Sequence, residues 1–139
     1  MSDEGLPRDR LGLEVLPVEQ CWELVSTSAV GRVAFVDAGE PTVLPVTHSV
    51  LGREIVFRSA SGTKLAAAQM NAAVAFEVDG WDATTQQGWS VLVRGTAETV
   101  YDEGEVAELD VRARAPWLDA AADGTWVRIR ANEISGRRL

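Results

Sequence analysis

The stretch Ile55-Val56-Phe57-Arg58-Ser59-Ala60-Ser61-Gly62-Thr63-Lys64-Leu65 is the most informative part of this chain of 139 residues. It begins as an apolar run typical of a strand, breaks at Ser and Gly, and leads directly into an alanine-rich segment at 66–70 that favours a helix. Lys64 stands where that helix begins, although the positive end of a helix dipole favours a carboxylate there. The stretch therefore predicts a strand-to-helix junction that carries a cation.

The composition of this junction is that of an anion-binding site. It holds two basic residues and three hydroxyl residues: Arg58, Lys64, Ser59, Ser61 and Thr63. Together with the backbone N–H groups that a helix start leaves free, such side chains bind anions, and phosphate is the typical guest. The alternative is a solvated turn whose basic residues face water. The residues of the junction alone leave both interpretations open.

The rest of the chain alternates between short strands and turns. Extended segments are expected at 31–36, 41–47, 55–57, 73–79, 88–101 and 125–134, and helices at 17–25, at 66–70 and from Asp102 to Pro116. Glu105, three residues after Asp102, gives the last helix a start like a capping box. The short connections predict antiparallel pairing rather than parallel crossovers. We expect a mainly β fold with short helices: a six-stranded antiparallel split β-barrel.

Two residues within the expected strands support a coiled barrel over a flat sheet. Pro45 in the second strand predicts an edge, a bulge or a ligand-facing break in the ladder, because proline has no N–H. Gly95 in the fifth strand predicts strong bending or a close approach of two backbones. A cofactor lying along the second strand would also fit Pro45.

Length and charge narrow the class of protein. We expect one domain at 13–139, preceded by a flexible N-terminal tail at 1–12 that is polar and aperiodic. A net charge of −8 argues against general binding to nucleic acid or to anionic membranes. One cysteine excludes an internal disulfide, and Cys21 falls on the apolar stripe of the first helix, where an inert thiol is expected. No segment resembles a signal peptide or a membrane span, so we expect a cytoplasmic protein.

Several reaction classes lack the residues they need. The single histidine, His48, leaves no Ser/His/Asp triad and, with one cysteine, no zinc site. Gly62-Thr63-Lys64 lacks the upstream glycine of a P-loop. His48 as an axial haem ligand is an alternative, but a packed or solvent-facing histidine is the favoured interpretation. No catalytic residue and no metal ligand is predicted.

The order of elements and motifs carries a resemblance to a known family. It rests on Val30-Gly31-Arg32-Val33-Ala34-Phe35, Pro41-x-Val43-x-Pro45-Val46, the junction from Phe57 to Lys64, Ala75-Phe76-Glu77-Val78-Asp79, and Gly88-Trp89-Ser90-Val91-Leu92-Val93-Arg94-Gly95. These segments, which cover nearly the whole chain after the tail, resemble the pyridoxamine 5′-phosphate oxidase-like flavin-binding split barrels.

The resemblance implies a homodimer that holds FMN in a groove between its subunits. It also implies an oxidoreductase that transfers hydride to or from an unidentified small organic substrate. In that family the strand-to-helix junction holds the FMN phosphate, in agreement with the anion site inferred above.

The resemblance also assigns cofactor-binding residues, position by position. By this resemblance the phosphate is bound by Arg58, Ser59, Ser61, Thr63 and Lys64. The flavin ring lies beside the backbone of Pro45, Val46 and Thr47. Trp89 and Ser90 approach the flavin from the long strand. The oxidase that gives the family its name has an Arg-x-x-x-Leu-Lys element and a C-terminal Arg/His set, and both are missing here, so oxidation of pyridoxamine phosphate is not expected. Three alternatives remain: a reductase of the same fold that uses the deazaflavin cofactor, a non-catalytic protein that binds or stores flavin, and a cofactor-free dimeric interaction module.

Overall fold

A computed structural model describes residues 5–59, 68, 71–114 and 124–139. Its elements are mainly strands, as predicted, with two helices of ten residues each. In chain order they are β1 (Glu14–Val15), α1 (Val18–Thr27), β2 (Val30–Asp37), β3 (Glu40–Leu51), β4 (Glu54–Arg58), β5 (Ala73–Asp82), β6 (Gln87–Thr99), α3 (Glu103–Arg112) and β7 (Trp126–Arg138).

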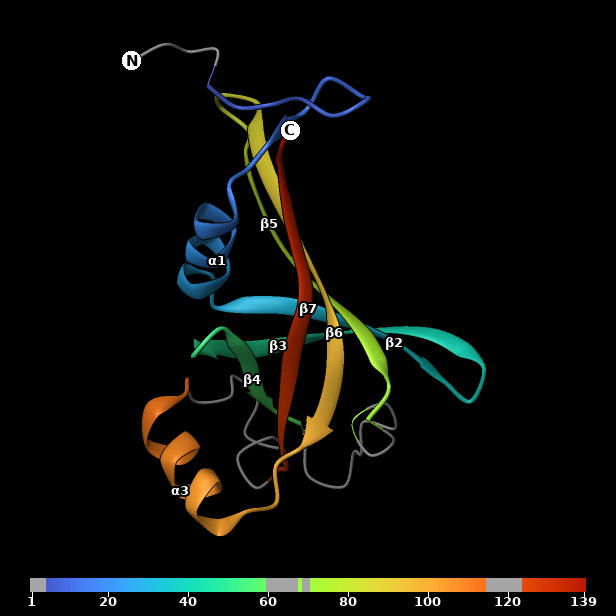
Figure 1. Cartoon of the computed structure of the whole chain (residues 1–139), viewed down its shortest axis with the longest axis vertical. Helices are drawn as coiled ribbons and strands as arrows, with labels where there is room; N and C mark the ends of the chain where they lie inside the picture. Colours follow the sequence, from blue (N-terminus) through green and yellow to red (C-terminus); the bar gives the residue numbers. More distant parts are fainter. Residues whose placement is uncertain (1–4, 60–67, 69–70, 115–123) are drawn as a thin grey trace.

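The strands close into a ring. Their order is β7-β4-β3-β2-β5-β6, and β6 pairs back onto β7. Figure 1 shows β2 and β3 crossing the long strands β5, β6 and β7. Every pairing is antiparallel. The predicted six-stranded antiparallel barrel is therefore confirmed. The short strand β1, which the sequence did not predict, adds two residues to the C-terminal end of β7.

Alternating residues of the strands fill the barrel interior. Phe57, Phe76, Ile55 and Ile129 are 1% exposed or less. Helix α1 packs its buried face, which includes Cys21, against this interior, and burial raises the pKa of the Cys21 thiol. A raised thiol pKa leaves little reactive thiolate. A second, smaller apolar cluster lies between α3 and the strands beneath it, and comprises Val56, Val100, Leu109 and Trp126.

The β5–β6 hairpin is longer than the sequence suggested. The strands expected at 73–79 and 88–101 leave residues 80–87 as a loop, but β5 continues to Asp82 and β6 begins at Gln87. Gly80 pairs with Trp89, and a Cβ on Gly80 would lie 2.7 Å from the Trp89 Nε1 atom. The glycine thus gives the indole ring room to lie on the opposite strand, and cross-strand contact of this kind extends the ladder.

The predicted helices agree with the structure where it describes them. Asp102 caps α3, and its carboxylate accepts a hydrogen bond of 3.0 Å from the Glu105 N–H. The helix ends at Arg112, and Pro116 lies outside the described residues. Of the helix expected at 66–70, only Ala68 is described; it is helical and buried.

The described part of the N-terminal segment contacts the end of the barrel. The Asp9 carboxylate pairs with Arg137 at 2.9 Å, and the Val15 N–H donates to the Pro7 carbonyl at 2.7 Å. The flexibility expected of the tail at 1–12 stays a prediction.

Candidate functional site

The segment Pro45-Val46-Thr47 lies where one backbone edge of β3 pairs with no strand of the described residues. On one side Pro45 pairs with Arg32 of β2. On the other side, pairing with β4 begins only at His48. Within the described residues no strand pairs with that edge of β3 ahead of His48, in agreement with the edge that was one of the three features predicted from Pro45. Unpaired backbone groups at such an edge can bind a ligand.

The Thr47 hydroxyl provides a second observation at the same edge. It is buried, and it has no hydrogen-bond partner in the described part of the chain. A buried hydroxyl without a partner costs about 1–3 kcal/mol. A bound group that supplied the partner would remove this cost, so β3 fits a ligand with polar atoms along its edge.

Arg58 and Ser59 continue from this region at the end of β4. Because His48 pairs with Phe57, Arg58 comes next to Thr47 in the register. Arg58 is already engaged: its Nε donates to the Gly124 carbonyl at 3.0 Å and its guanidinium lies 3.3 Å from the Asp110 carboxylate. Ser59 bonds to Thr125 through both its N–H and its hydroxyl. The remaining predicted phosphate residues, Ser61, Thr63 and Lys64, lie outside the described residues.

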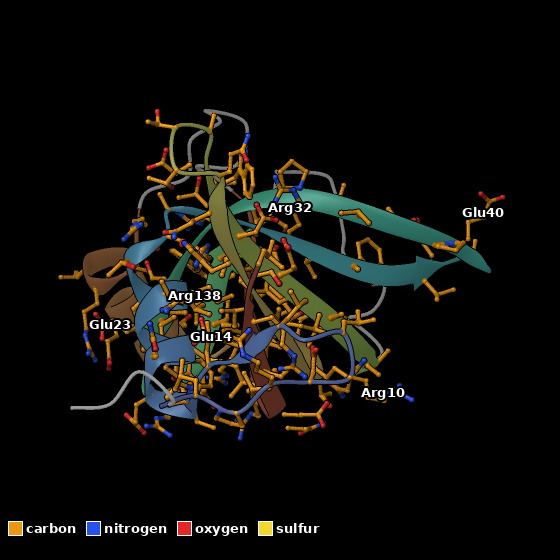
Figure 2. The ribbon with its side chains drawn as sticks, turned by 90° about the horizontal axis from the view of Figure 1, so that it is seen from above. Arg10, Glu14, Glu23, Arg32, Glu40 and Arg138 are labelled. Carbon is orange, nitrogen blue, oxygen red and sulfur yellow. The ribbon has the colours of Figure 1, made fainter. Side chains whose placement is uncertain are left out.

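Trp89 and Ser90 lie at the other end of the molecule and face opposite ways. Trp89 pairs with Arg138 and lines a pocket of about 420 Å³ together with that arginine. Ser90 pairs with Arg137, and its side chain points to the opposite face of the sheet, as that of the next residue in a strand must. Figure 2 shows Arg138 beside Glu14, whose carboxylate lies 3.7 Å from it.

The predicted site residues therefore fall into two groups that one chain keeps apart. Arg58 pairs with Trp126 at the start of β7, whereas Ser90 pairs with Arg137 near its end. Eleven residues of strand separate these two positions, which corresponds to roughly 35 Å. Figure 1 shows the C-terminus near the top of the molecule and β4 below its middle. This span exceeds the reach of one FMN from its phosphate to its ring.

A charged cluster that the sequence did not predict as a site lies beside Pro45. The Nη1 atom of Arg32 is 3.3 Å from a carboxylate oxygen of Glu77 and 3.3 Å from one of Asp79. Burial, reinforced by the neighbouring Asp79 carboxylate, raises the pKa of Glu77 to about 7, although Arg32 opposes the shift. Period-two alternation places Glu77 and Asp79 on one face of β5, and that much was readable from the sequence. Their partner on β2, Arg32, could not be predicted from the sequence, because the contact depends on the pairing of residues 45 positions apart.

The raised pKa predicts how pH acts on stability. Between about 4.5 and 7 the folded chain holds a proton at Glu77 that the unfolded chain has released, so stability falls as pH rises through this range. Glu77→Gln mimics the protonated carboxyl and removes the penalty. We expect the melting temperature of the variant, relative to the parent, to be higher at pH 8 than at pH 5. Glu108→Gln removes an exposed carboxylate paired with Arg112 on α3, and its effect should be the same at both pH values. A Glu77→Gln difference that does not change with pH would contradict the prediction.

An apolar groove flanks this cluster on the same side of the barrel. It has a volume of about 760 Å³. Ala34, Val43 and Ala75 of β2, β3 and β5 line it, and Arg94 of β6 and Glu133 of β7 also contribute to the lining. β5 pairs with β2 only up to Ala34, and beyond it the β2–β3 hairpin projects as an arm, residues 35–42, with Glu40 at its tip (Figure 2). Val36 and Val43 on this hairpin are 64% and 58% exposed. Exposed valines beside an apolar groove are typical of an interaction surface.

The described residues offer little for other kinds of site, such as a haem site or a metal site. His48 is fully buried and its Nε2 lies 2.8 Å from the Val25 carbonyl, so the imidazole is a packed side chain, the interpretation favoured over a haem ligand. No three His, Cys, Asp or Glu side chains gather as a metal site in this part of the chain. Nor is any helix here long and apolar enough to cross a membrane.

Comparisons with known proteins agree with this architecture. Residues 17–138 match the family described as pyridoxamine 5′-phosphate oxidase. The uncharacterized protein Rv0080 of Mycobacterium tuberculosis is 32% identical, over 99% of this chain and 93% of that protein. Among solved structures, an FAD binding protein from Mycobacterium smegmatis is 36% identical to this chain, with a TM-score of 0.73. The match covers 90% of this chain and 97% of the M. smegmatis chain. Protein DIP1874 of Corynebacterium diphtheriae, of unknown function, is 30% identical with a TM-score of 0.76, over 91% of this chain and 98% of its own. The family match over most of the chain, on a closed six-stranded barrel, places this protein in the pyridoxamine 5′-phosphate oxidase-like family of split barrels.

Proposed function

We propose that this protein binds a flavin nucleotide at a site built from two copies of the chain. One copy provides the free edge of β3 at 45–47 and the phosphate residues from Arg58 to Lys64, and the other provides Trp89 and Ser90. The observation that carries this proposal is the separation of roughly 35 Å between the two groups, combined with the unpaired edge of β3. The arm and the apolar groove supply the surface on which a second copy would pack.

The residues of the site and one relative support the choice of a flavin as cofactor. The predicted cofactor is FMN, and the relative from M. smegmatis that is 36% identical is named as an FAD binding protein. Both carry the same isoalloxazine ring and a phosphate, and both suit the β3 edge and the basic junction. When bound, the flavin supplies a hydride acceptor at its N5 atom. The protein's part is to orient the ring along β3, exclude water and fix the phosphate; we propose an oxidoreductase that acts on a small organic substrate.

Titration of the purified protein with FMN, FAD and the deazaflavin cofactor, followed by fluorescence, tests this function. We expect micromolar or tighter binding of a flavin, one per chain, by a protein that light scattering identifies as a dimer. Steady turnover with a reductant and a nitroaromatic or quinone acceptor would support the enzyme, whereas tight binding without turnover would favour a flavin-storing protein. Binding of none of the three cofactors would overturn the proposal.

Lys64 offers a sharper test because it is the only lysine of the chain. Lys64→Ala should weaken FMN binding about 10- to 100-fold, since a charge-assisted phosphate contact contributes about 1.5–3 kcal/mol. Riboflavin, which has no phosphate, should bind parent and variant alike. Bound FMN should also protect Lys64 of the parent from acetylation, as read by mass spectrometry. Equal acetylation with and without FMN would remove Lys64 from the site.

Complementation between variants tests the two-copy site. In a dimer with composite sites, Lys64→Glu and Ser90→Trp should each abolish FMN binding at both sites. Refolding the two variants together should restore one intact site in every mixed dimer. A site confined to one chain predicts a different result: Ser90→Trp alone would then leave the phosphate-proximal site functional, and mixing would add nothing.

A further inference from the structure

Arg58 is the basic residue of the predicted phosphate junction that the structure describes, and its guanidinium already faces two acceptors. Its Nε donates to the Gly124 carbonyl at 3.0 Å, and its Nη2 lies 3.3 Å from the Oδ1 atom of Asp110 on α3. Nε and Nη2 form one edge of a guanidinium, and such an edge can bind a phosphate through two parallel hydrogen bonds. Groups of the chain itself therefore occupy an edge of Arg58 that a phosphate would use.

The carboxylate of Asp110 is fixed beside Arg58 by Trp126. The indole Nε1 of Trp126 donates to the same Oδ1 atom at 2.8 Å. Trp126 is 4% exposed, and a buried indole N–H needs an acceptor. Trp126 also pairs with Arg58 in the register of β4 and β7, and the Arg58 guanidinium lies 5.2 Å from the centre of its ring. Movement of Asp110 away from Arg58 would thus leave the indole N–H without this acceptor.

Helix α3, which carries Asp110, is held in place by contacts that do not involve the junction. Leu109 packs in the smaller apolar cluster, and Asp102 caps the first turn. Arg128 of β7 donates to Glu105 at 3.1 Å. Figure 1 shows α3 at the end of the molecule away from the C-terminus. A phosphate that reaches the junction therefore meets a carboxylate in a fixed position.

This carboxylate and a phosphate carry charges of the same sign. A phosphate monoester has a charge of about −1.5 to −2 at pH 7. Asp110 balances the single positive charge of Arg58 within the chain before any ligand arrives. The phosphate must either draw Arg58 away from Asp110 or bind beside a carboxylate, and each alternative reduces the binding free energy.

We propose that Asp110 competes with the phosphate of the ligand for Arg58, and thereby weakens the binding of phosphate-bearing ligands at the junction. This inference rests on the function proposed above, and adds to it the residue that sets how much the phosphate contributes to affinity. In the proposed site the flavin ring, beside β3, supplies binding energy that inorganic phosphate lacks. Asp110 then keeps inorganic phosphate from filling the site while the cofactor is absent.

Asp110→Asn tests this competition, and Glu108→Gln is the matched control. Asparagine has nearly the shape of aspartate and keeps an oxygen for Trp126, but it has no charge to pair with Arg58. Glu108 lies on the same helix and pairs with Arg112, so Glu108→Gln changes the net charge by the same amount outside the junction. The probes are FMN, riboflavin and inorganic phosphate. The measurements are the dissociation constants of the two flavins and the inhibition of FMN binding by inorganic phosphate.

Loss of the carboxylate should strengthen the binding of phosphate and leave the binding of the ring unchanged. We expect Asp110→Asn to bind FMN about fivefold more tightly, which is the upper range for a partly exposed ion pair. Inorganic phosphate should inhibit FMN binding at a concentration lower by the same factor. Riboflavin, which has no phosphate, should bind Asp110→Asn and the parent alike. Glu108→Gln should match the parent in all three measurements.

Each other outcome counts against the proposal. Weaker FMN binding by Asp110→Asn would mean that Asp110 positions Arg58 for the phosphate instead of competing with it. Unchanged FMN binding would mean that the ion pair has no influence on the site, and equal tightening in both variants would be an effect of net charge. These three results leave flavin binding by the parent intact, whereas a parent that binds no flavin overturns the proposed function as well. If Asp110→Asn does not fold, Asp110→Ser removes the same charge; if riboflavin binds too weakly to measure, FMN and inorganic phosphate decide.

Discussion

Gly95→Val should destabilise the protein by about 3 kcal/mol or more, which is the largest effect that we expect from a single substitution. β6 and β7 shift register between Arg94 and Gly95, and at this bulge the two backbones come into close contact. A Cβ on Gly95 would collide with the Arg130 carbonyl group, lying 2.9 Å from its carbon. Backbone atoms of a paired strand cannot move aside as the end of a flexible side chain can. The substitution therefore forces β6 and β7 apart where they close the barrel.

Urea unfolding of the purified variant measures this loss, and Thr96→Val is the matched control. Thr96 is the next residue of the same strand, and valine has nearly its shape, so we expect a change within about 0.5 kcal/mol. If Gly95→Val unfolds too readily to be purified, Gly95→Ala gives a milder version of the same collision. A Gly95→Ala protein as stable as the parent would show that the bulge accommodates a side chain.

Gly95 also shows why much of the barrel was predictable. Glycine inside a long apolar strand has few structural explanations, and short turns between strands leave few ways to pair them. The length of the β5–β6 hairpin was not predictable in the same way. The polar sequence after Gly80 resembles a loop, and only the pairing with the opposite strand reveals that Gly80 and Gly88 face tryptophan rings. Strand β1 was missed because two residues carry no detectable periodicity.

The sequence could predict the candidate site only where it depends on consecutive residues. The unpaired edge at Pro45 is such a feature and is observed, whereas the anion site from Arg58 to Lys64 stays a prediction. The ion pair of Arg58 with Asp110 joins residues 52 positions apart, and no local pattern predicts a carboxylate beside Arg58. The same holds for Arg32 with Glu77 and Asp79. Long-range contacts therefore decide which basic residues keep donors available for a ligand, and these contacts require the fold.

His48→Ala should lower the free energy of unfolding by about 3 kcal/mol at pH 8, through a cavity and a lost hydrogen bond. The imidazole is fully buried, packs edge-on against Phe76 with 4.8 Å between ring centres, and donates from Nε2 to the Val25 carbonyl. Nδ1 then carries no proton and has no partner among the described residues. The substitution removes the donor to a carbonyl at the end of α1 as well as the ring.

The cost of this substitution should shrink as the solution becomes more acidic. Burial lowers the pKa of His48, and the nearby Arg114 guanidinium adds to the shift, although the bond to Val25 opposes it. Below the ordinary value of 6.5 the unfolded chain takes up a proton that the folded chain resists, so the parent loses stability as pH falls, by at most about 1.4 kcal/mol per pH unit. His48→Ala lacks this loss. Acidification also acts through Glu77, where it stabilises the folded chain, but Glu77 is present in both proteins and its effect cancels in the comparison. Urea unfolding of both proteins at pH 8, 6.5 and 5 measures the difference between them. A difference that stays constant over these three pH values would mean that the folded chain protonates His48 as easily as the unfolded one, against the environment described here.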